Sequence, residues 1–103
     1  MKEYLYFSAP WCGPCRTLGP VMQSVGQTIP VRKINVDEQS DIAQKYGIRN
    51  VPTVILLDNG HEVKRHIGVK PVNVYLSVCL LLYITHAYIK TYEYIYIYMV
   101  VSI

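Results

Sequence analysis

The sequence predicts an α/β fold in which helices flank a four-stranded mixed sheet, with the element order β-α-β-α-β-β-α. Short apolar runs of strand length alternate with segments of helical periodicity, which is the pattern of β-α-β units. An Asp-Asn-Gly sequence at residues 58–60 joins the last two strand-like runs as a hairpin. The length of 103 residues suits one domain with a single modest core.

The first part of the chain predicts a strand followed by a helix. Residues 3–7 form an apolar run and are expected to be a buried strand. A helix is expected from about Cys12 to about Gln27. Its inward face carries apolar residues at helical spacing, namely Cys15, Leu18, Met22 and Val25. This periodicity places Cys15 toward the core and Cys12 at the exposed tip of the helix, and Pro20 inside the helix predicts a kink.

The middle of the chain predicts a strand, a short helix and another strand. We expect a strand at residues 31–36, a helix at 37–46 that ends at Gly47, and a strand at 53–57. Because helices connect the strands at residues 3–7, 31–36 and 53–57, the two crossovers predict parallel strand pairs.

The last elements follow from the hairpin. A strand at residues 62–67 returns antiparallel to its predecessor and adds an antiparallel edge, so the sheet is mixed. Gly68 ends this strand, and Pro71 opens a last, apolar helix.

The most informative segment is Trp11-Cys12-Gly13-Pro14-Cys15, at the junction of the first strand and the first helix. The unpaired N–H groups and the dipole at a helix start favour a thiolate over a thiol. A lowered pKa of Cys12 provides a nucleophile near neutral pH, and a thiol one turn later can attack whatever the first sulfur has joined. These are the requirements of dithiol–disulfide exchange.

A zinc site is the alternative for two cysteines at this spacing. Zinc needs four ligands, usually from a second such pair or from paired histidines. The third cysteine is Cys79, and His61, His66 and His86 do not have ligand spacing. Pro14 between the cysteines favours a rigid helix start, so we expect no metal. Cys79 is expected to be a buried thiol of the last helix, and His61 and His66 to lie on the solvated side of the hairpin strand.

The composition argues against some classes of function and indicates the cellular compartment. The net charge is +3 without a basic run, which argues against a nucleic-acid partner. Three cysteines do not make a disulfide framework, so we expect a reducing, cytoplasmic compartment. No apolar signal-peptide core precedes the cysteine pair, which argues against secretion. We expect a monomer.

The C-terminal region differs in composition from the rest. We expect one domain over residues 1–84 and an apolar extension, rich in tyrosine and isoleucine, over residues 85–103 without a function of its own. Residues 71–89 contain no charged side chain, so a membrane anchor is an alternative. Residues 74–83 are needed to cover the sheet, which argues against that anchor.

Several separated segments resemble the thioredoxin family. They are residues 7–16 (FSAPWCGPCR), Pro20, residues 33–37 (KINVD), residues 45–53 (KYGIRNVPT), Asn59-Gly60 and Gly68. The resemblance covers residues 3 to about 83 and implies the thioredoxin fold. It also implies a protein disulfide reductase whose cysteines carry the electrons without a cofactor. Its implied partners are disulfide-containing client proteins and an upstream thioredoxin-type reductase.

The resemblance implies a role for each matching residue. Cys12 is the attacking nucleophile and Cys15 the resolving thiol, and the two form the redox-active disulfide. Val51-Pro52 resembles the family's cis-proline loop, which lies against the active site. The implied client-binding residues are Trp11, Gly13, Pro14, Val51, Pro52 and Gly68.

The chain also departs from the family pattern. It begins at the strand that leads to the active site, without the family's N-terminal strand and helix. Tyr6 stands where the family has a buried aspartate, and Lys33 matches the lysine beside that aspartate. A phenol, with an ordinary pKa of about 10, is a poor proton acceptor at neutral pH. We therefore expect slower resolution by Cys15, with Tyr6 and Lys33 as supporting residues.

Three other functions remain open at this level. One is a disulfide oxidase or isomerase of the same fold, although Gly13-Pro14 resembles the reducing members. Another is a protein-binding module that does not depend on redox chemistry. The last is a nonfunctional product whose extension prevents folding.

Overall fold

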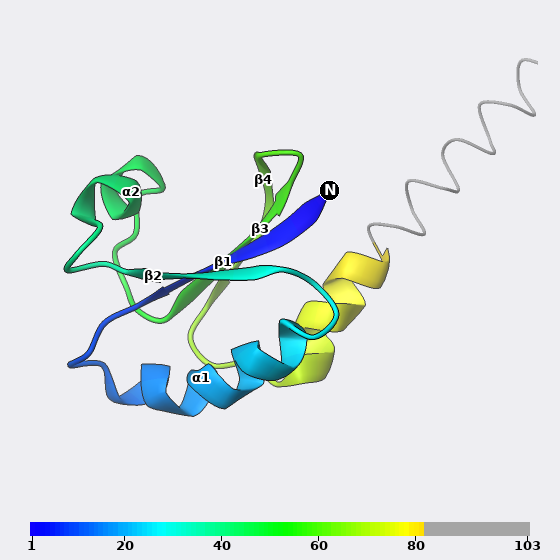
Figure 1. Ribbon diagram of the computed structural model, residues 1–103, viewed down its shortest axis with the longest axis horizontal. Helices are drawn as coiled ribbons and strands as arrows, with labels where there is room; N and C mark the ends of the chain where they lie inside the picture. The colour runs from blue at the N-terminus through cyan, green and yellow to red at the C-terminus, as the bar shows by residue number, and fades with distance from the viewer. Residues whose placement is uncertain (82–103) are drawn as a thin grey trace, which may run out of the picture.

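Four strands form one sheet, and helices cover both of its faces (Figure 1). The structure, a computed structural model, describes residues 1–81. Its elements are β1 (Lys2–Ser8), α1 (Gly13–Val25), β2 (Val31–Asn35), α2 (Ser40–Lys45), β3 (Thr53–Asp58) and β4 (His61–Ile67). A further helical segment covers residues 72–81. The predicted α/β class and element order are confirmed.

The sheet is mixed, with the strand order β2-β1-β3-β4. β1 pairs with β2 in parallel, and the other two strand pairs are antiparallel. The prediction of parallel pairs from both crossovers is therefore wrong for the second one. α2 has six residues and spans only about 9 Å, so it does not carry the chain back along the sheet. β3 begins at the end of the sheet where β2 finishes and runs back beside β1.

Two apolar layers hold the helices to the sheet. On one face, α1 and the segment 72–81 pack on side chains of β1 and β3 (Figure 1). The predicted stripe of α1 is buried there, and so are Tyr75 and Cys79 one helical turn apart. Cys79 is a free thiol with 7% of its surface exposed, as expected. α2 packs on the opposite face against Leu5, Phe7 and Ile55.

Local signals explain the boundaries of the shorter elements. Asn59 and Gly60 both have positive φ angles, 52° and 84°, which is the backbone of a two-residue hairpin turn. The helix predicted from residue 37 begins three residues later, at Ser40. The Asn35 side chain accepts a hydrogen bond from the Asp37 backbone N–H at 2.9 Å and closes a turn instead, because such short polar side chains compete with the helix for backbone groups.

His66 is the main correction within the sheet. His61 is exposed as expected, but His66 keeps only 6% of its surface exposed. The register of β4 shifts by one residue at Val63, which has no partner opposite it. Because of this shift His61 and His66, five positions apart, both lie on the face of Val54, whereas strict alternation would place them on opposite faces. On that face Tyr75 of the segment 72–81 covers His66, and His61 at the hairpin end stays exposed. His66 lies opposite Val54 and packs edge-on against the Tyr75 ring, with centroids 5.0 Å apart.

The burial of His66 predicts a loss of stability in mild acid. Burial lowers the pKa of His66 below its ordinary 6.5, and Lys64 and Lys70 lower it further by repulsion. Below about pH 6.5, the unfolded chain therefore binds a proton that the folded chain does not bind. The contribution of the neutral His66 to the free energy of unfolding is complete above that pH. It is lost as the pH falls toward the lower pKa of the folded state. The slope is at most about 1.4 kcal/mol per pH unit.

Urea unfolding at pH 5, 6 and 7 measures this effect in the wild type and His66→Phe. We expect a shallower pH dependence in His66→Phe, because the buried imidazole is gone. His61→Phe is the matched control and keeps the wild-type slope, since that side chain is solvated. Equal slopes in all three proteins contradict the prediction.

The predicted extension over residues 85–103 lies outside the described residues. Within residues 1–81, no helix has the length and hydropathy to cross a membrane.

Candidate active site

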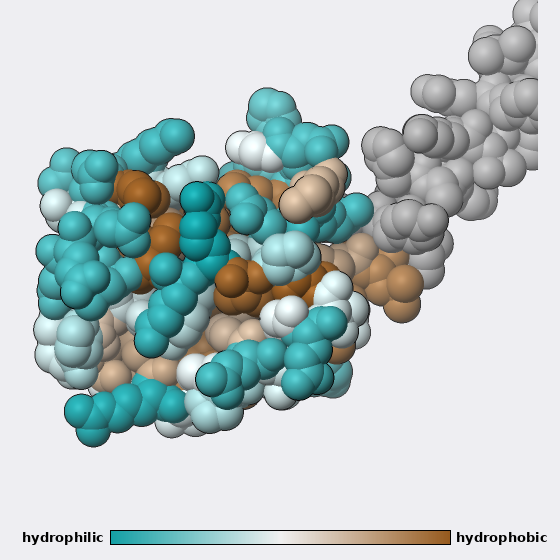
Figure 2. Space-filling model, in the orientation of Figure 1, coloured by the Kyte–Doolittle hydropathy of each residue, from teal (hydrophilic) through white to brown (hydrophobic). Residues whose placement is uncertain are grey.

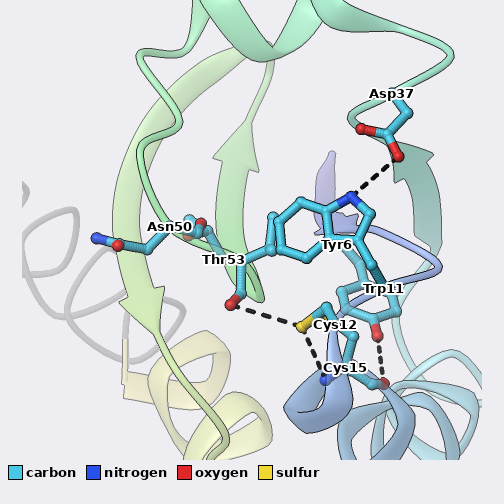
Figure 3. Close-up of a disulfide and its surroundings, with 8 residues drawn as sticks. Tyr6, Trp11, Cys12, Cys15, Asp37, Asn50 and Thr53 are labelled. Carbon is cyan, nitrogen blue, oxygen red and sulfur yellow. Dashed lines mark hydrogen bonds between the residues drawn. A yellow bond between two sulfur atoms is a disulfide. The ribbon is translucent and has the colours of Figure 1, made fainter.

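A disulfide joins Cys12 and Cys15 at the start of α1 (Figure 3). Their Cα atoms are 5.3 Å apart. Cys12 is the N-cap residue with an extended backbone, and its Sγ accepts a hydrogen bond from the Cys15 backbone N–H at 3.2 Å. β1, an inner strand of the sheet, delivers the chain to this point. The sulfur of Cys12 thus faces the unpaired donors of a helix start.

The cysteine side chains are more covered than expected. Cys15 has 6% of its surface exposed, in line with its predicted inward position. Cys12 has only 4% exposed, so the prediction of an exposed tip is wrong for this side chain. The Sγ of Cys12 lies 3.6 Å from the Val51 carbonyl oxygen. Val36 and Val51 pack against the cluster that the two cysteines form with Ala9. A loop distant in sequence covers the sulfur, which helical periodicity does not reveal.

That covering loop contains a cis peptide bond between Val51 and Pro52, as the resemblance implied. The Gly68 N–H donates a hydrogen bond to the Pro52 carbonyl at 3.0 Å. The Thr53 hydroxyl donates to the Asn50 carbonyl at 2.6 Å. Tertiary structure alone thus brings Val51 against the Cys12 sulfur, and Gly68 is hydrogen-bonded to Pro52 in the same loop region.

Trp11 is the exposed apolar residue beside the disulfide. Its side chain is 69% exposed, and Gly13 and Pro14 beyond Cys12 are also exposed. The indole Nε1–H donates a hydrogen bond to Asp37 Oδ2 at 3.1 Å (Figure 3). Sequence reasoning did not single out Asp37 as a site residue. The two residues are 26 positions apart, and no local pattern pairs an indole with a carboxylate.

Tyr6 lies behind the disulfide with 3% of its surface exposed. Its hydroxyl donates a hydrogen bond to the Cys15 carbonyl at 2.8 Å. Burial raises the pKa of Tyr6, and the neighbouring Ser8 lowers it in part, so the phenol is neutral at pH 7. Lys33 is Tyr6's partner across β1 and β2 but is exposed, and no ion pair involves it within residues 1–81. Tyr6 is thus hydrogen-bonded to the Cys15 backbone, and Lys33 lies next to Tyr6 on the neighbouring strand.

Two adjoining cavities lie at the surface between α1 and β2. Their volumes are about 510 and 490 Å³, and both are lined by Tyr6, Gly19 and Lys33. Cys15 also lines the second cavity, and Met22 and Val31 also line the first. Figure 2 shows apolar surface between α1 and β2 on this side of the molecule. Water can therefore approach Cys15 from the side of Lys33.

No group of three or more histidine, cysteine or acidic side chains within residues 1–81 is placed to hold a metal ion. The chemistry available at this site is that of two adjacent sulfurs, one neutral phenol and backbone donors.

The chain is similar to known proteins over most of the described region. The model of the family described as Thioredoxin matches residues 3–78. The thioredoxin of Bacillus subtilis is 42% identical over 69 residues, which are 63% of this chain and 66% of the relative. That of Chlamydia pneumoniae is 43% identical over 67 residues, 62% and 66% of the two chains. The matches thus span just under two thirds of the length of these relatives.

Solved structures agree with this assignment. A mutant thioredoxin from Halobacterium salinarum superposes with a TM-score of 0.70 and 34% identity, over 75% of this chain and 70% of that one. Thioredoxin NaTrxh from Nicotiana alata gives a TM-score of 0.70 and 36% identity, over 76% and 70%. The family model alone covers well over half of the sequence. The chain therefore belongs to the thioredoxin family.

Proposed function

We propose that this protein is a protein disulfide reductase that works by dithiol–disulfide exchange through Cys12 and Cys15. The observation that carries the proposal is the disulfide between them at the start of α1, with the Cys15 N–H directed at the Sγ of Cys12. A donor in this position stabilises negative charge on that sulfur and favours its attack.

The proposed cycle transfers two electrons to a client protein. In the reduced protein, the Cys12 thiolate attacks one sulfur of the client disulfide, and the other client sulfur leaves as a thiolate and takes a proton from water. Cys15 releases its proton to water, and its thiolate attacks the Cys12 sulfur of the mixed disulfide. The client sulfur that was bound to Cys12 leaves as a thiolate and takes up a proton, and the Cys12–Cys15 disulfide remains. An upstream thioredoxin-type reductase supplies two electrons to open it, and no cofactor resident in this chain is required.

We propose that the residues around the disulfide bind the client. Three of them, Trp11, Gly13 and Pro14, are exposed beside the cysteines. Val51 contacts the sulfur of Cys12, and Gly68 is hydrogen-bonded to the neighbouring Pro52; in this proposal these three residues bind the client from the opposite side. Cys12 keeps 4% exposure in the disulfide form, so we expect the client sulfur that Cys12 attacks to approach beside the Val51 carbonyl. The proposed setting is a reducing, cytoplasmic compartment, with the protein acting as a monomer.

The proposal is tested by dithiothreitol-coupled reduction of insulin by the full chain. We expect turnover that a Cys12→Ser, Cys15→Ser double variant does not support. Client binding that persists in the double variant, without turnover in the wild type, would indicate a binding module instead. A measured reduction potential separates a reductase from an oxidase or isomerase of the same fold.

Replacing Tyr6 by aspartate is expected to accelerate the second step. The buried phenol donates to the Cys15 carbonyl and is neutral between pH 6 and 8, so it does not take up the Cys15 proton. An aspartate there can act as a general base, and a positioned base typically contributes about 10²-fold or more. Turnover in Tyr6→Asp from pH 6 to 8 measures the effect, with Tyr6→Asn as the control that lacks both phenol and base. Equal turnover of these two variants across this range contradicts the prediction.

A further inference from the structure

We propose that residues 93–99 of this chain pair as a further strand with the free edge of β2 and cover the groove beside it. This inference concerns the tyrosine- and isoleucine-rich extension and does not depend on the redox chemistry. It gives that extension, which the sequence alone left without a function, a binding surface on the same molecule.

β2 is an edge strand of the sheet, and within residues 1–81 no strand pairs with its outer side. The Val36 N–H, just after β2, donates a hydrogen bond to the Ser8 carbonyl of β1 at 3.0 Å. Because successive residues of a strand bond to opposite sides, the N–H and C=O groups of Val31 and Lys33 point away from β1. Such a row of outward backbone groups is a template for another strand.

An apolar groove runs beside this edge, between β2 and α1 (Figure 2). It is the first of the two cavities, with a volume of about 510 Å³, and Tyr6, Met22, Val31 and Lys33 contribute to its lining. The side chains of a strand added to β2 alternate between the groove and the opposite side. A strand that is apolar at alternate positions can therefore bury side chains in this groove.

Residues 93–99, with the sequence EYIYIYM, have the composition that this edge requires. Tyrosine and isoleucine both favour strands, and each alternate set of the segment is apolar or aromatic. Glu93 is the only charged side chain after Lys90, whereas β2 exposes two cations, Arg32 and Lys33. Opposite charges on neighbouring strands stabilise their pairing.

A second copy of β2 is a poorer partner for the same edge. When two β2 edges pair about a two-fold axis, Arg32 and Lys33 of one copy lie against the same cations of the other. Like charges on facing strands destabilise a sheet, and cations on an edge strand oppose this kind of association. The charges therefore favour the chain's own extension over a dimer.

The described part of the chain ends close to this edge. The Sγ of Cys79 lies 3.6 Å from the Tyr4 hydroxyl, and Tyr4 is the register partner of Val31 at the start of β2. Residues 82–92 connect this region to residue 93, and eleven residues span up to about 36 Å. The five residues of β2 extend over only about 17 Å. The extension can therefore reach the whole edge in either direction.

The proposed pairing stops before the end of β2. The Asn35 carbonyl already accepts hydrogen bonds from the N–H groups of Glu38 and Gln39. The second cavity, which Asn35 and Cys15 line, lies at this end. The added strand thus covers the groove beside Val31 and leaves the approach of water to Cys15 open.

Hydrogen exchange of the Val31 and Lys33 N–H groups, measured by NMR on the full chain, tests the pairing. We expect exchange in the wild type to be at least about tenfold slower than in the double variant Tyr96→Pro, Ile97→Pro. Adjacent N–H groups of a strand point to opposite sides, so this double substitution removes a hydrogen bond to β2 in either register. The control Tyr88→Pro, Ile89→Pro makes the same changes in the connecting residues and is expected to keep the wild-type exchange rates.

Nuclear Overhauser contacts identify the partner strand directly. We expect contacts between the backbones of β2 and residues 93–99 within one molecule, at rates of exchange that do not depend on protein concentration. Fast exchange of both N–H groups in the wild type overturns the inference without any variant. Equal exchange in the wild type and the variant at residues 96 and 97, or an equal loss of protection in the control, also overturns it. Contacts found only between differently labelled copies assign the edge to a second molecule and overturn it as well.

Discussion

Cys12→Ser is expected to abolish insulin reduction, lowering turnover by at least about 10³-fold. The hydroxyl of serine is not ionised near neutral pH, so the helix start has no thiolate to stabilise. Cys15→Ser is expected to stop the cycle one step later. Its Cys12 attacks the client normally, but no second thiol releases the mixed disulfide.

Mass spectrometry after mixing with oxidised client distinguishes the two variants. Cys15→Ser is expected to carry one client chain, and Cys12→Ser none. Cys79→Ser is the control with normal turnover, since this buried thiol contacts the Tyr4 hydroxyl at 3.6 Å and lies in a different part of the core. A trapped client on Cys12→Ser instead would exchange the roles of the two sulfurs.

Cys12 is almost fully buried in the disulfide form, so its reactivity after reduction is the most demanding test of its role as the attacking nucleophile. After reduction, iodoacetamide is expected to modify Cys12 ahead of Cys15 and Cys79. A Cys12 that stays unmodified while the reduced protein is folded would show that the Val51 contact closes the site, and the proposed cycle would then have no first step.

Tyr75→Ala is expected to destabilise the fold by about 3–5 kcal/mol. Tyr75 is fully buried and anchors the segment 72–81 on the sheet. Its ring packs edge-on against Tyr4 with centroids 5.7 Å apart, and against His66 on the other side. Small domains have total stabilities of about 5–15 kcal/mol. The loss is therefore a large share of the whole, and urea unfolding with circular dichroism detection measures it.

Two conservative variants separate ring packing from hydroxyl chemistry. The Tyr75 hydroxyl is buried without a hydrogen-bond partner within residues 1–81. Burial raises its pKa, and the Lys70 backbone offsets part of that rise. Tyr75→Phe is therefore expected to be neutral or stabilising. The Tyr4 hydroxyl donates to the Tyr75 carbonyl at 2.6 Å, so Tyr4→Phe is expected to cost about 1 kcal/mol. The reverse order of these two effects contradicts the account.

Local sequence patterns predicted the helices and strands well where a residue type or its spacing determines the local backbone conformation. Asn59-Gly60 specified the hairpin because both positions need positive φ angles. The stripe along α1 specified its buried face because its spacing follows the helical period. The same reasoning failed at His66, because Tyr75 of the segment 72–81 covers that side chain. The pattern within a strand does not show which element packs on it.

For the site, the sequence by itself determined the chemistry: two sulfurs one turn apart at a helix start, with a phenol behind them. Tertiary structure alone decided their surroundings. The cis Val51-Pro52 loop over Cys12, the Asp37 carboxylate on Trp11 and the antiparallel placement of β3 all join segments that are distant along the chain. Periodicity and capping act within a few residues, whereas these contacts depend on how the sheet brings its loops together. The reacting sulfurs are thus specified by a short stretch of sequence, whereas their accessibility depends on the fold.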